Sequence, residues 1–376
     1  MSKPFRLLLV ALAAALVCVP TAGAARGMLV GLLDEAALYD EPESVFPLLQ
    51  QARTQVLRVN LYWGGRVGVA ATRPASATNP NDPAYDWELY DRTVNYAAQH
   101  RIRVLFSIYG TPRWANRGAG LNAPPTRLVD LRNFAYAAAR RYSGSWRASD
   151  ERTLPAVRHW LAWNEPNYPI GLKRQFRRVG GGWVIQSALD YVKICTAVYD
   201  GVHRTLLRNT KVGCGATGPR GNNQPTSSRP TVSPLAFMRA LKRAGLKRFD
   251  AYAHHPYYGR RTESPTTKPA STAVTLANID LLTAELSRLW GPKRLWITEY
   301  GYQTNPPDRA LGVSYQQQAA YMKQAFAIAR KNPRIDMMLW FLLRDEPGLG
   351  GWQSGLMTRT GRKKPAFNVF RLLPRG

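Results

Sequence analysis

Short apolar runs alternate with longer segments of helical periodicity along the chain, and this alternation repeats eight times. Strand, helix and strand in succession are typical of βαβ units with a parallel sheet, and eight such units favour closure into a barrel. We therefore predict an α/β fold of the (β/α)8 or TIM-barrel type. The predicted strands are Met28–Leu33, Val56–Tyr62, Arg103–Ile108, Val157–Trp163, Lys211–Thr217, Arg248–His254, Leu295–Glu299 and Ile335–Phe341.

The segments between these runs have the apolar spacing of amphipathic helices. No linker or low-complexity block interrupts the pattern, so we expect one catalytic domain over residues 25–376. Loops rich in proline, serine and threonine, at 219–234 and 262–272, follow the fifth and sixth strands and should lie on the catalytic face of the barrel. The clearest helical patterns lie at Asp86–His100, Ser187–Leu207, Tyr315–Lys331 and Pro365–Leu373.

The first 24 residues have the features of a signal peptide. Lys3 and Arg6 precede the apolar run Leu7–Val19, and small residues at 22–24 suit a cleavage site. The run is too short for a membrane anchor, which needs about 20 apolar residues. Cys18 follows Val17, which is not small, so we do not expect a lipid anchor. The sequence predicts a secreted, extracellular protein without a transmembrane span.

The cysteine content and the net charge bear on two further questions, namely disulfide bonding and nucleic-acid binding. Only Cys195 and Cys214 remain after the signal peptide, and the sequence leaves open whether they form a disulfide bond. The net charge of +28 raises the possibility of a nucleic-acid-binding protein. However, the basic residues are spread along the chain instead of being gathered in one segment. We therefore expect adhesion to anionic surfaces and no specific nucleic-acid partner.

Motifs for cofactor chemistry are missing from the sequence. The five histidines include no HExxH or other close ligand spacing, so we expect no metal ion. No GxGxxG follows the first predicted strand, there is no phosphate-binding loop, and no GxSxG marks a nucleophile elbow. We therefore expect no cofactor.

Two predicted strands end in a glutamate. The segment Trp160–Asn167 is apolar up to Asn164-Glu165, and Pro166 then ends the strand. Leu295–Gly301 follows the same pattern and carries Glu299. Catalytic groups of barrel enzymes lie at the C-terminal strand ends. Two carboxyl groups across one pocket can cleave a glycosidic bond, with retention at about 5–5.5 Å and inversion at about 6.5–9.5 Å. The sequence gives no such distance.

These motifs resemble the signature of clan A glycoside hydrolases, and the resemblance spans nearly the whole mature chain. The stretch Trp163–Asn167 is more similar to family 39 and its relatives than to family 5. The resemblance implies a retaining hydrolase of β-linked O-glycosides, with Glu165 as general acid/base and Glu299 as nucleophile. It also implies that Asn164 binds the sugar 2-hydroxyl.

Four further residues match the clan pattern. The resemblance implies that Arg58 lies near the nucleophile and keeps it ionised. It implies that His255 and Tyr257 lie at the end of the sixth strand, with Tyr257 donating to the nucleophile, and that Trp340 forms an aromatic floor under the sugar. Because His254 adjoins His255, the register here is ambiguous by one residue. Each of the four could instead be structural, as an ion pair or core residue.

Other features bear on the substrate. The basic cluster Lys173, Arg174, Arg177 and Arg178 follows Glu165, and it would favour an anionic glycan if it lined the cleft. Otherwise it is a solvated charge run. The loop around Asn79–Tyr85 and the long loop after the fourth strand favour an extended cleft and endo action. Three tryptophans on predicted rim loops could stack on sugars: Trp63, Trp114 and Trp352.

Together these patterns predict an exported, monomeric β-glycosidase that acts on an oligosaccharide or polysaccharide without a cofactor. Two alternatives remain. The barrel could bind glycans without cleaving them, or the positive charge could serve a polyanion-binding protein of the cell wall.

Overall fold

The computed structural model describes residues 27–148, 150–348 and 350–375. The predicted signal peptide, 1–24, and Cys18 lie outside the described residues. No helix in the described part of the chain is long and apolar enough to cross a membrane.

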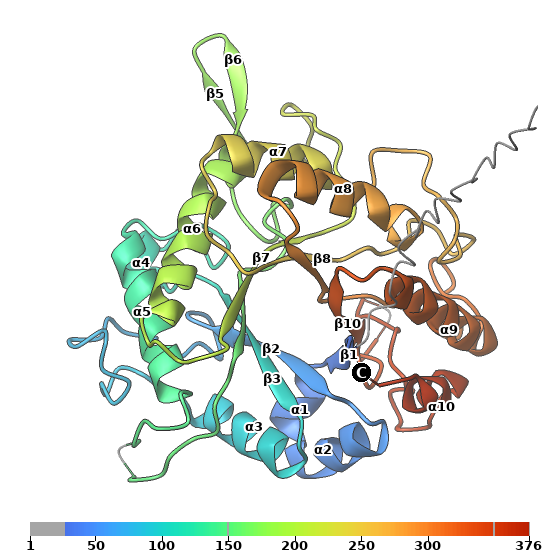
Figure 1. Cartoon of the computed structure of the whole chain (residues 1–376), viewed down its shortest axis with the longest axis horizontal. Helices are drawn as coiled ribbons and strands as arrows, with labels where there is room; N and C mark the ends of the chain where they lie inside the picture. The colour runs from blue at the N-terminus through green and yellow to red at the C-terminus, as the bar shows by residue number, and fades with distance from the viewer. Residues whose placement is uncertain (1–26, 149, 349, 376) are drawn as a thin grey trace, which may run out of the picture.

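Eight parallel strands close into a barrel at the centre of the molecule (Figure 1). Their order around the barrel is β1-β10-β9-β8-β7-β4-β3-β2. Strands that follow one another in the chain are therefore adjacent in the barrel, except that β5 and β6 form a separate hairpin between β4 and β7. All eight predicted barrel strands are present, and the (β/α)8 prediction is confirmed. The strands are β1 (Leu29–Leu33), β2 (Val56–Tyr62), β3 (Arg103–Tyr109), β4 (His159–Ala162), β7 (Lys211–Thr217), β8 (Ala251–His254), β9 (Arg294–Ile297) and β10 (Ile335–Phe341).

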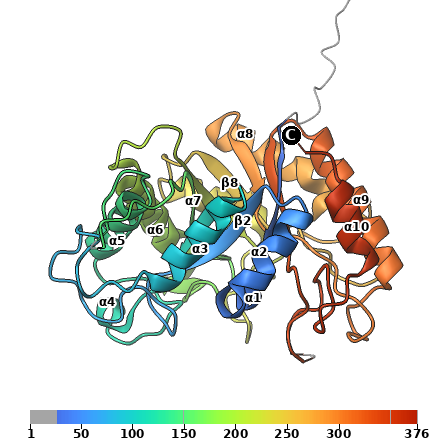
Figure 2. The same ribbon diagram turned by 90° about the horizontal axis from the view of Figure 1, so that it is seen from below.

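Helices surround the barrel, as both views show (Figures 1 and 2). The four clearest predicted helices are present, with bounds that differ by at most four residues. Ser314 caps the start of the one predicted at 315–331, because its side chain accepts the backbone N–H of Gln317. The helices are α1 (Ala36–Asp40), α2 (Pro42–Gln51), α3 (Glu88–Gln99), α4 (Arg113–Asn116), α5 (Leu128–Arg141), α6 (Gln186–His203), α7 (Pro234–Arg243), α8 (Ile279–Trp290, after the 3-10 turn Leu276–Asn278), α9 (Tyr315–Lys331) and α10 (Pro365–Leu372).

The barrel interior is a packed core and not a channel. Leu161, Trp296 and Leu339 belong to a buried apolar cluster contributed by several strands. Gly213 makes room for the indole of Trp296, since an added Cβ would lie 2.7 Å from the ring. The filled interior leaves space for a ligand only at the ends of the barrel.

A disulfide bond joins Cys195 on α6 to Cys214 on β7, with the two Cα atoms 6.0 Å apart. This answers the question that the sequence left open. The bond links a helix to the strand that follows it, so it reinforces one βα layer of the barrel.

A two-stranded hairpin, which the sequence did not predict, interrupts the barrel order. Strands β5 (Phe176–Val179) and β6 (Gly182–Ile185) pair antiparallel and extend beyond the ring of helices (Figure 1). Gly180, with φ of +56°, permits the tight turn between them. The hairpin carries part of the basic cluster that follows Glu165.

Candidate active site

A cavity of about 530 Å³ opens at the C-terminal ends of the strands, a size typical of ligand pockets. Asn164, Glu165, Tyr257 and Glu299 all line it. They come from the segments after β4, β8 and β9, which are far apart in the chain. The barrel therefore brings these four predicted site residues together.

The two glutamates face each other across this cavity. One carboxyl oxygen of Glu165 and one of Glu299 lie within 4.8 Å of each other. Their side chains are 18% and 12% exposed, so each reaches the cavity from a mostly buried position. Glu165 has φ of +40° and Trp163 has φ of +68°, in the left-handed region that non-glycine residues rarely adopt. This unusual backbone, just beyond the end of β4, directs Glu165 to the cavity.

Two donors hold the carboxyl group of Glu299 in place. Arg58 Nη1 donates to its Oε1 at 2.8 Å, and the Tyr257 hydroxyl donates to its Oε2 at 3.2 Å. The Arg58 side chain is fully buried. The guanidinium and the phenol therefore fix the orientation of the Glu299 carboxyl group. A carboxyl group held in this way and aimed into a cavity is suited to nucleophilic attack.

Glu165 lies in a different electrostatic environment. Burial raises the pKa of Glu165 from 4.5 to about 7, and the positive charge of Arg58 only partly opposes this rise. A carboxyl group with this pKa is still about half protonated at neutral pH and can donate its proton to a leaving group. The two glutamates therefore differ in the way that proton donor and nucleophile must differ.

His255 links the two carboxyl groups. Its Nε2 lies 3.2 Å from Arg58 Nη1, which can only donate, and this contact favours the tautomer in which Nε2 is unprotonated. Nε2 also lies 2.9 Å from Thr298 Oγ1, a hydroxyl that can donate or accept. In this tautomer Nδ1 carries the proton and donates to Glu165 Oε1 at 3.0 Å. Burial lowers the pKa of His255 to about 4, which keeps the imidazole neutral.

The neighbouring histidine points elsewhere, which resolves the ambiguous register after β8. His254 contacts Thr217 Oγ1 at 2.9 Å and the carbonyl oxygen of Val274 at 2.9 Å, and it does not line the cavity. His255 is thus the histidine that faces the glutamates.

Glu165, His255 and Glu299 also form a group whose ligand atoms could in principle hold a metal ion. Two observations argue against that use. The protonated Nδ1 has no lone pair to offer, and the Arg58 guanidinium already supplies positive charge to Glu299. These residues do not fit a metal ion as they stand.

Asn164 is fixed by the same arginine. Its Oδ1 accepts a hydrogen bond from Arg58 Nη2 at 2.7 Å. This bond fixes the oxygen toward Arg58 and leaves the Nδ2 amide hydrogens available to donate to a ligand. Asn164 lines the cavity beside Glu165, where such a donor would reach a sugar hydroxyl.

Trp340 does not occupy the predicted position. Its side chain is fully buried, packs in the core, and donates to the carbonyl oxygen of Ser354 at 2.8 Å, so it does not line the cavity. Side chains alternate along a strand, and the next residue, Phe341, faces the cavity instead. The prediction of Trp340 as an aromatic floor is therefore wrong.

Of the three rim tryptophans, only Trp352 reaches the cavity. Its ring lies 5.8 Å from that of Tyr257 and 5.5 Å from that of Phe341, and together these rings form an aromatic wall. Trp63 is buried in the core, and the Trp114 indole donates to a backbone carbonyl of the loop after β2.

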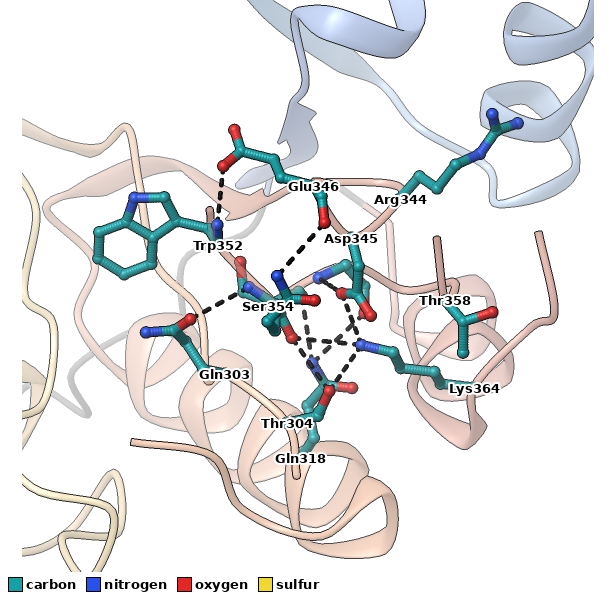
Figure 3. Close-up of polar contacts among 12 residues, drawn as sticks. Gln303, Thr304, Gln318, Arg344, Asp345, Glu346, Trp352, Ser354, Thr358 and Lys364 are labelled. Carbon is teal, nitrogen blue, oxygen red and sulfur yellow. Dashed lines mark hydrogen bonds and ion pairs between the residues drawn. The ribbon is translucent and has the colours of Figure 1, made fainter. Parts of the chain in front are cut away.

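A buried lysine, Lys364, joins the loops next to the aromatic wall, and it donates to the carbonyl oxygen of Gln353, the residue after Trp352 (Figure 3). Lys364 donates to Asp345 Oδ1 at 2.7 Å and to Thr304 Oγ1 at 2.8 Å, and it joins the loop after β10 to the loop after β9. Glu346 Oε2 accepts the backbone N–H of Trp352 at 2.7 Å, which holds the tryptophan at the rim. The contacts below the wall are therefore polar and specific.

Glu35 is a cavity residue that the sequence reasoning missed. Its Oε1 accepts the backbone N–H of Asn60 and its Oε2 accepts the Tyr62 hydroxyl, both at 3.1 Å. Burial raises the pKa of Glu35 to about 7. It follows the end of β1 as Glu165 and Glu299 follow β4 and β9, so the same pattern could have identified it.

The basic cluster after Glu165 does not line the cavity. Residues 168, 170 and 171 contribute to the wall, whereas Lys173, Arg174, Arg177 and Arg178 are exposed and lie beyond it. The loop at 79–85 contributes no lining residue either. The charged residues in the lining are four acidic side chains and one basic side chain, namely Glu35, Glu165, Glu299, Glu346 and Arg220.

Two comparisons concern the sequence alone. A family of unknown function (DUF5722) matches residues 247–374, about the last third of the chain. No curated protein matches the sequence.

Solved structures of glycoside hydrolases share the fold. A family 39 glycoside hydrolase from Bacteroides cellulosilyticus is 18% identical, with a TM-score of 0.60, over 92% of this chain and 63% of the other. A family 39 β-xylosidase from Caulobacter crescentus is 16% identical, with a TM-score of 0.60, over 93% and 72%. A family 1 β-glucosidase from Thermotoga maritima is 12% identical, with a TM-score of 0.59, over 92% and 97%. The chain thus spans less than two thirds of the first enzyme. The expected resemblance to family 39 is confirmed at the level of the fold.

Proposed function

We propose that the protein is a retaining glycoside hydrolase that cleaves β-linked glycans. One observation carries the proposal: the carboxyl oxygens of Glu165 and Glu299 lie within 4.8 Å of each other in one cavity. This separation suits retention, for which about 5–5.5 Å is typical, and leaves little room for the water of an inverting mechanism.

The reaction proceeds in two displacements. Glu165 gives its proton to the glycosidic oxygen while Glu299 attacks the anomeric carbon, which breaks the glycosidic bond and forms a glycosyl-enzyme ester. Glu165, now a carboxylate, then takes a proton from water as the water oxygen attacks the same carbon. The ester bond breaks, Glu299 regains its charge and Glu165 its proton.

The surrounding residues support these two steps. Arg58 and Tyr257 hold the Glu299 carboxyl group in its orientation. His255 donates to the Glu165 oxygen and so fixes the direction of the carboxyl group. Asn164 directs its amide hydrogens to the sugar, where a hydrogen bond to the 2-hydroxyl would strengthen in the transition state.

The lining points to a neutral or positively charged sugar at the cleavage site. Two further acidic side chains, Glu35 and Glu346, line the cavity beside the two catalytic glutamates, and Arg220 is the one basic side chain in the lining in the part of the chain that the structure describes. A carboxylate sugar would be repelled in this partly dehydrated space. The earlier suggestion of an anionic glycan therefore has no support at the cavity itself.

We further propose that the protein cleaves within the chain of an extracellular or cell-surface polysaccharide, which is endo action. The long segment after β4 supports it, since Tyr168 and Ile170 extend the cavity wall beyond the glutamates. The predicted signal peptide supports export. A size analysis of products tests the endo part: early release of mid-length fragments supports it, and release of monosaccharide alone contradicts it.

A panel of activated aryl β-glycosides tests the proposal as a whole. We expect turnover of at least one neutral glycoside, loss of activity in Glu299→Ala, and full activity in the exposed control Glu88→Ala. Glu165→Ala should retain part of its activity on substrates with a good leaving group, and azide should increase its rate. Unchanged activity in Glu299→Ala would exclude the assignment. Tight glycan binding without turnover would instead identify a glycan-binding barrel.

A further inference from the structure

The β5–β6 hairpin exposes large apolar side chains at its tip. In the described part of the chain, eight large apolar side chains are exposed, and two of them flank the hairpin turn. Val179 ends β5 and is 46% exposed, and Trp183 is the second residue of β6 and is 48% exposed. Trp183 makes no aromatic contact and no side-chain hydrogen bond with another described residue. Apolar surface has therefore been left at the outermost point of a projecting element.

Positive charge gathers just behind this tip. Lys173, Arg174, Arg177 and Arg178 are exposed, and none forms an ion pair with a described residue. Arg177 donates to Gln186 Oε1 at 2.8 Å and interacts electrostatically with Asp190 at the start of α6. The other three cations have no acidic partner among the described residues. The hairpin therefore presents an excess of positive charge next to exposed apolar side chains.

The register of the hairpin indicates the shape of the partner. Arg178 pairs with Trp183 and Val179 pairs with Gly182, so Trp183 and Val179 lie on opposite faces of the ribbon. Cations also occur on both faces, since Arg177 and Arg178 are adjacent. A partner that lies along one face would contact only one of the apolar residues. A partner that surrounds the tip would contact both.

We propose that the β5–β6 hairpin is a membrane-docking element that inserts its tip into the headgroup layer of an anionic lipid bilayer. Tryptophan favours the membrane–water interface, and basic residues near the surface are attracted by anionic lipids. The tip places Trp183 and Val179 at the depth of the headgroups, with the four cations behind them near the lipid phosphates. The proposal is independent of the reaction in the cavity, because none of these residues lines it.

Vesicle co-sedimentation tests the proposal with the whole chain. Wild type should bind vesicles that contain phosphatidylglycerol and should not bind pure phosphatidylcholine. Trp183→Ala should weaken binding on the order of tenfold, because half of an indole is no longer buried. Lys173→Gln with Arg178→Gln should weaken it about 25-fold, since each charge contributes about fivefold. The matched control, Lys247→Gln with Lys323→Gln, removes two exposed charges elsewhere and should weaken it about twofold at most.

A label at the turn reports the insertion directly. Gly181 can be replaced without a clash, because an added Cβ would meet nothing within 4 Å. A polarity-sensitive dye on Gly181→Cys, in a Cys18→Ser background, should shift to the blue on anionic vesicles. Equal losses in the hairpin and control variants, or an unshifted dye, would overturn the proposal. So would failure to bind vesicles combined with Trp183-dependent retention on an acidic polysaccharide. Thermal unfolding of each variant verifies that it is folded.

Discussion

Replacing Glu165 by glutamine should make the protein more stable at alkaline pH while it removes the proton donor. The buried carboxyl group resists ionisation, and its pKa rises from 4.5 to about 7. Such a rise corresponds to about 3 kcal/mol of unfavourable free energy for the charged form. Glutamine has nearly the same shape, keeps an oxygen that can accept from His255 Nδ1, and never ionises.

The sign of this stability difference follows from how the folded and the unfolded chain bind the Glu165 proton. Below pH 4.5 the group is protonated both in the folded and in the unfolded chain, so it has no effect on stability. Between pH 4.5 and 7 the unfolded chain loses the proton first, and the folded state is progressively destabilised. Above pH 7 the full cost of about 3 kcal/mol is present in wild type and absent in Glu165→Gln.

Urea unfolding at pH 4 and pH 8 measures this difference. We expect similar unfolding free energies for the two proteins at pH 4, and an advantage of about 3 kcal/mol for Glu165→Gln at pH 8. Glu88→Gln, at the exposed start of α3, is the control and should show no such change between the two pH values. An advantage of equal size at both pH values, or none at pH 8, would refute the reasoning that burial perturbs Glu165.

Three further predictions concern the supports of the site and the fold. Tyr257→Phe removes one charge-assisted hydrogen bond to the nucleophile and should lower kcat/KM by roughly 10- to 100-fold with little change in melting temperature. Lys364→Met leaves Asp345 buried without its partner and should cost about 3–5 kcal/mol of stability in denaturant titration, of which a second change, Asp345→Asn, should restore part. Reduction of the Cys195–Cys214 disulfide, which closes a short loop, should cost about 3 kcal/mol, and an unchanged thermal midpoint in reductant would contradict this.

The sequence predicted the barrel and its two central glutamates for a physical reason. Apolar runs separated by amphipathic segments specify parallel strands, and closure of eight units brings all C-terminal strand ends to one face. Glu165 and Glu299 could therefore be placed together although 134 positions separate them. Pro166 helped, because proline cannot donate to a sheet ladder and so limits how far a strand can extend, although β4 itself already ends at Ala162.

The sequence could not predict which side chains at a strand end point into the cavity. Trp340 and Phe341 are both apolar aromatic residues at one strand end, and only the barrel register decides which one faces the cavity. Glu35 was missed although it follows β1. Glycosidic cleavage needs only two carboxyl groups, and Glu165 and Glu299 already supplied that pair. The hairpin after β4 was missed because its four-residue strands are short and one of them is dominated by arginine.

The stereochemistry of hydrolysis tests the central claim most directly. Proton NMR can follow the first sugar released from an activated aryl β-glycoside, before mutarotation mixes the anomers. Two glutamates at this separation predict that the β-anomer appears first, through a glycosyl-Glu299 ester. Initial release of the α-anomer would contradict double displacement and the roles assigned to both residues.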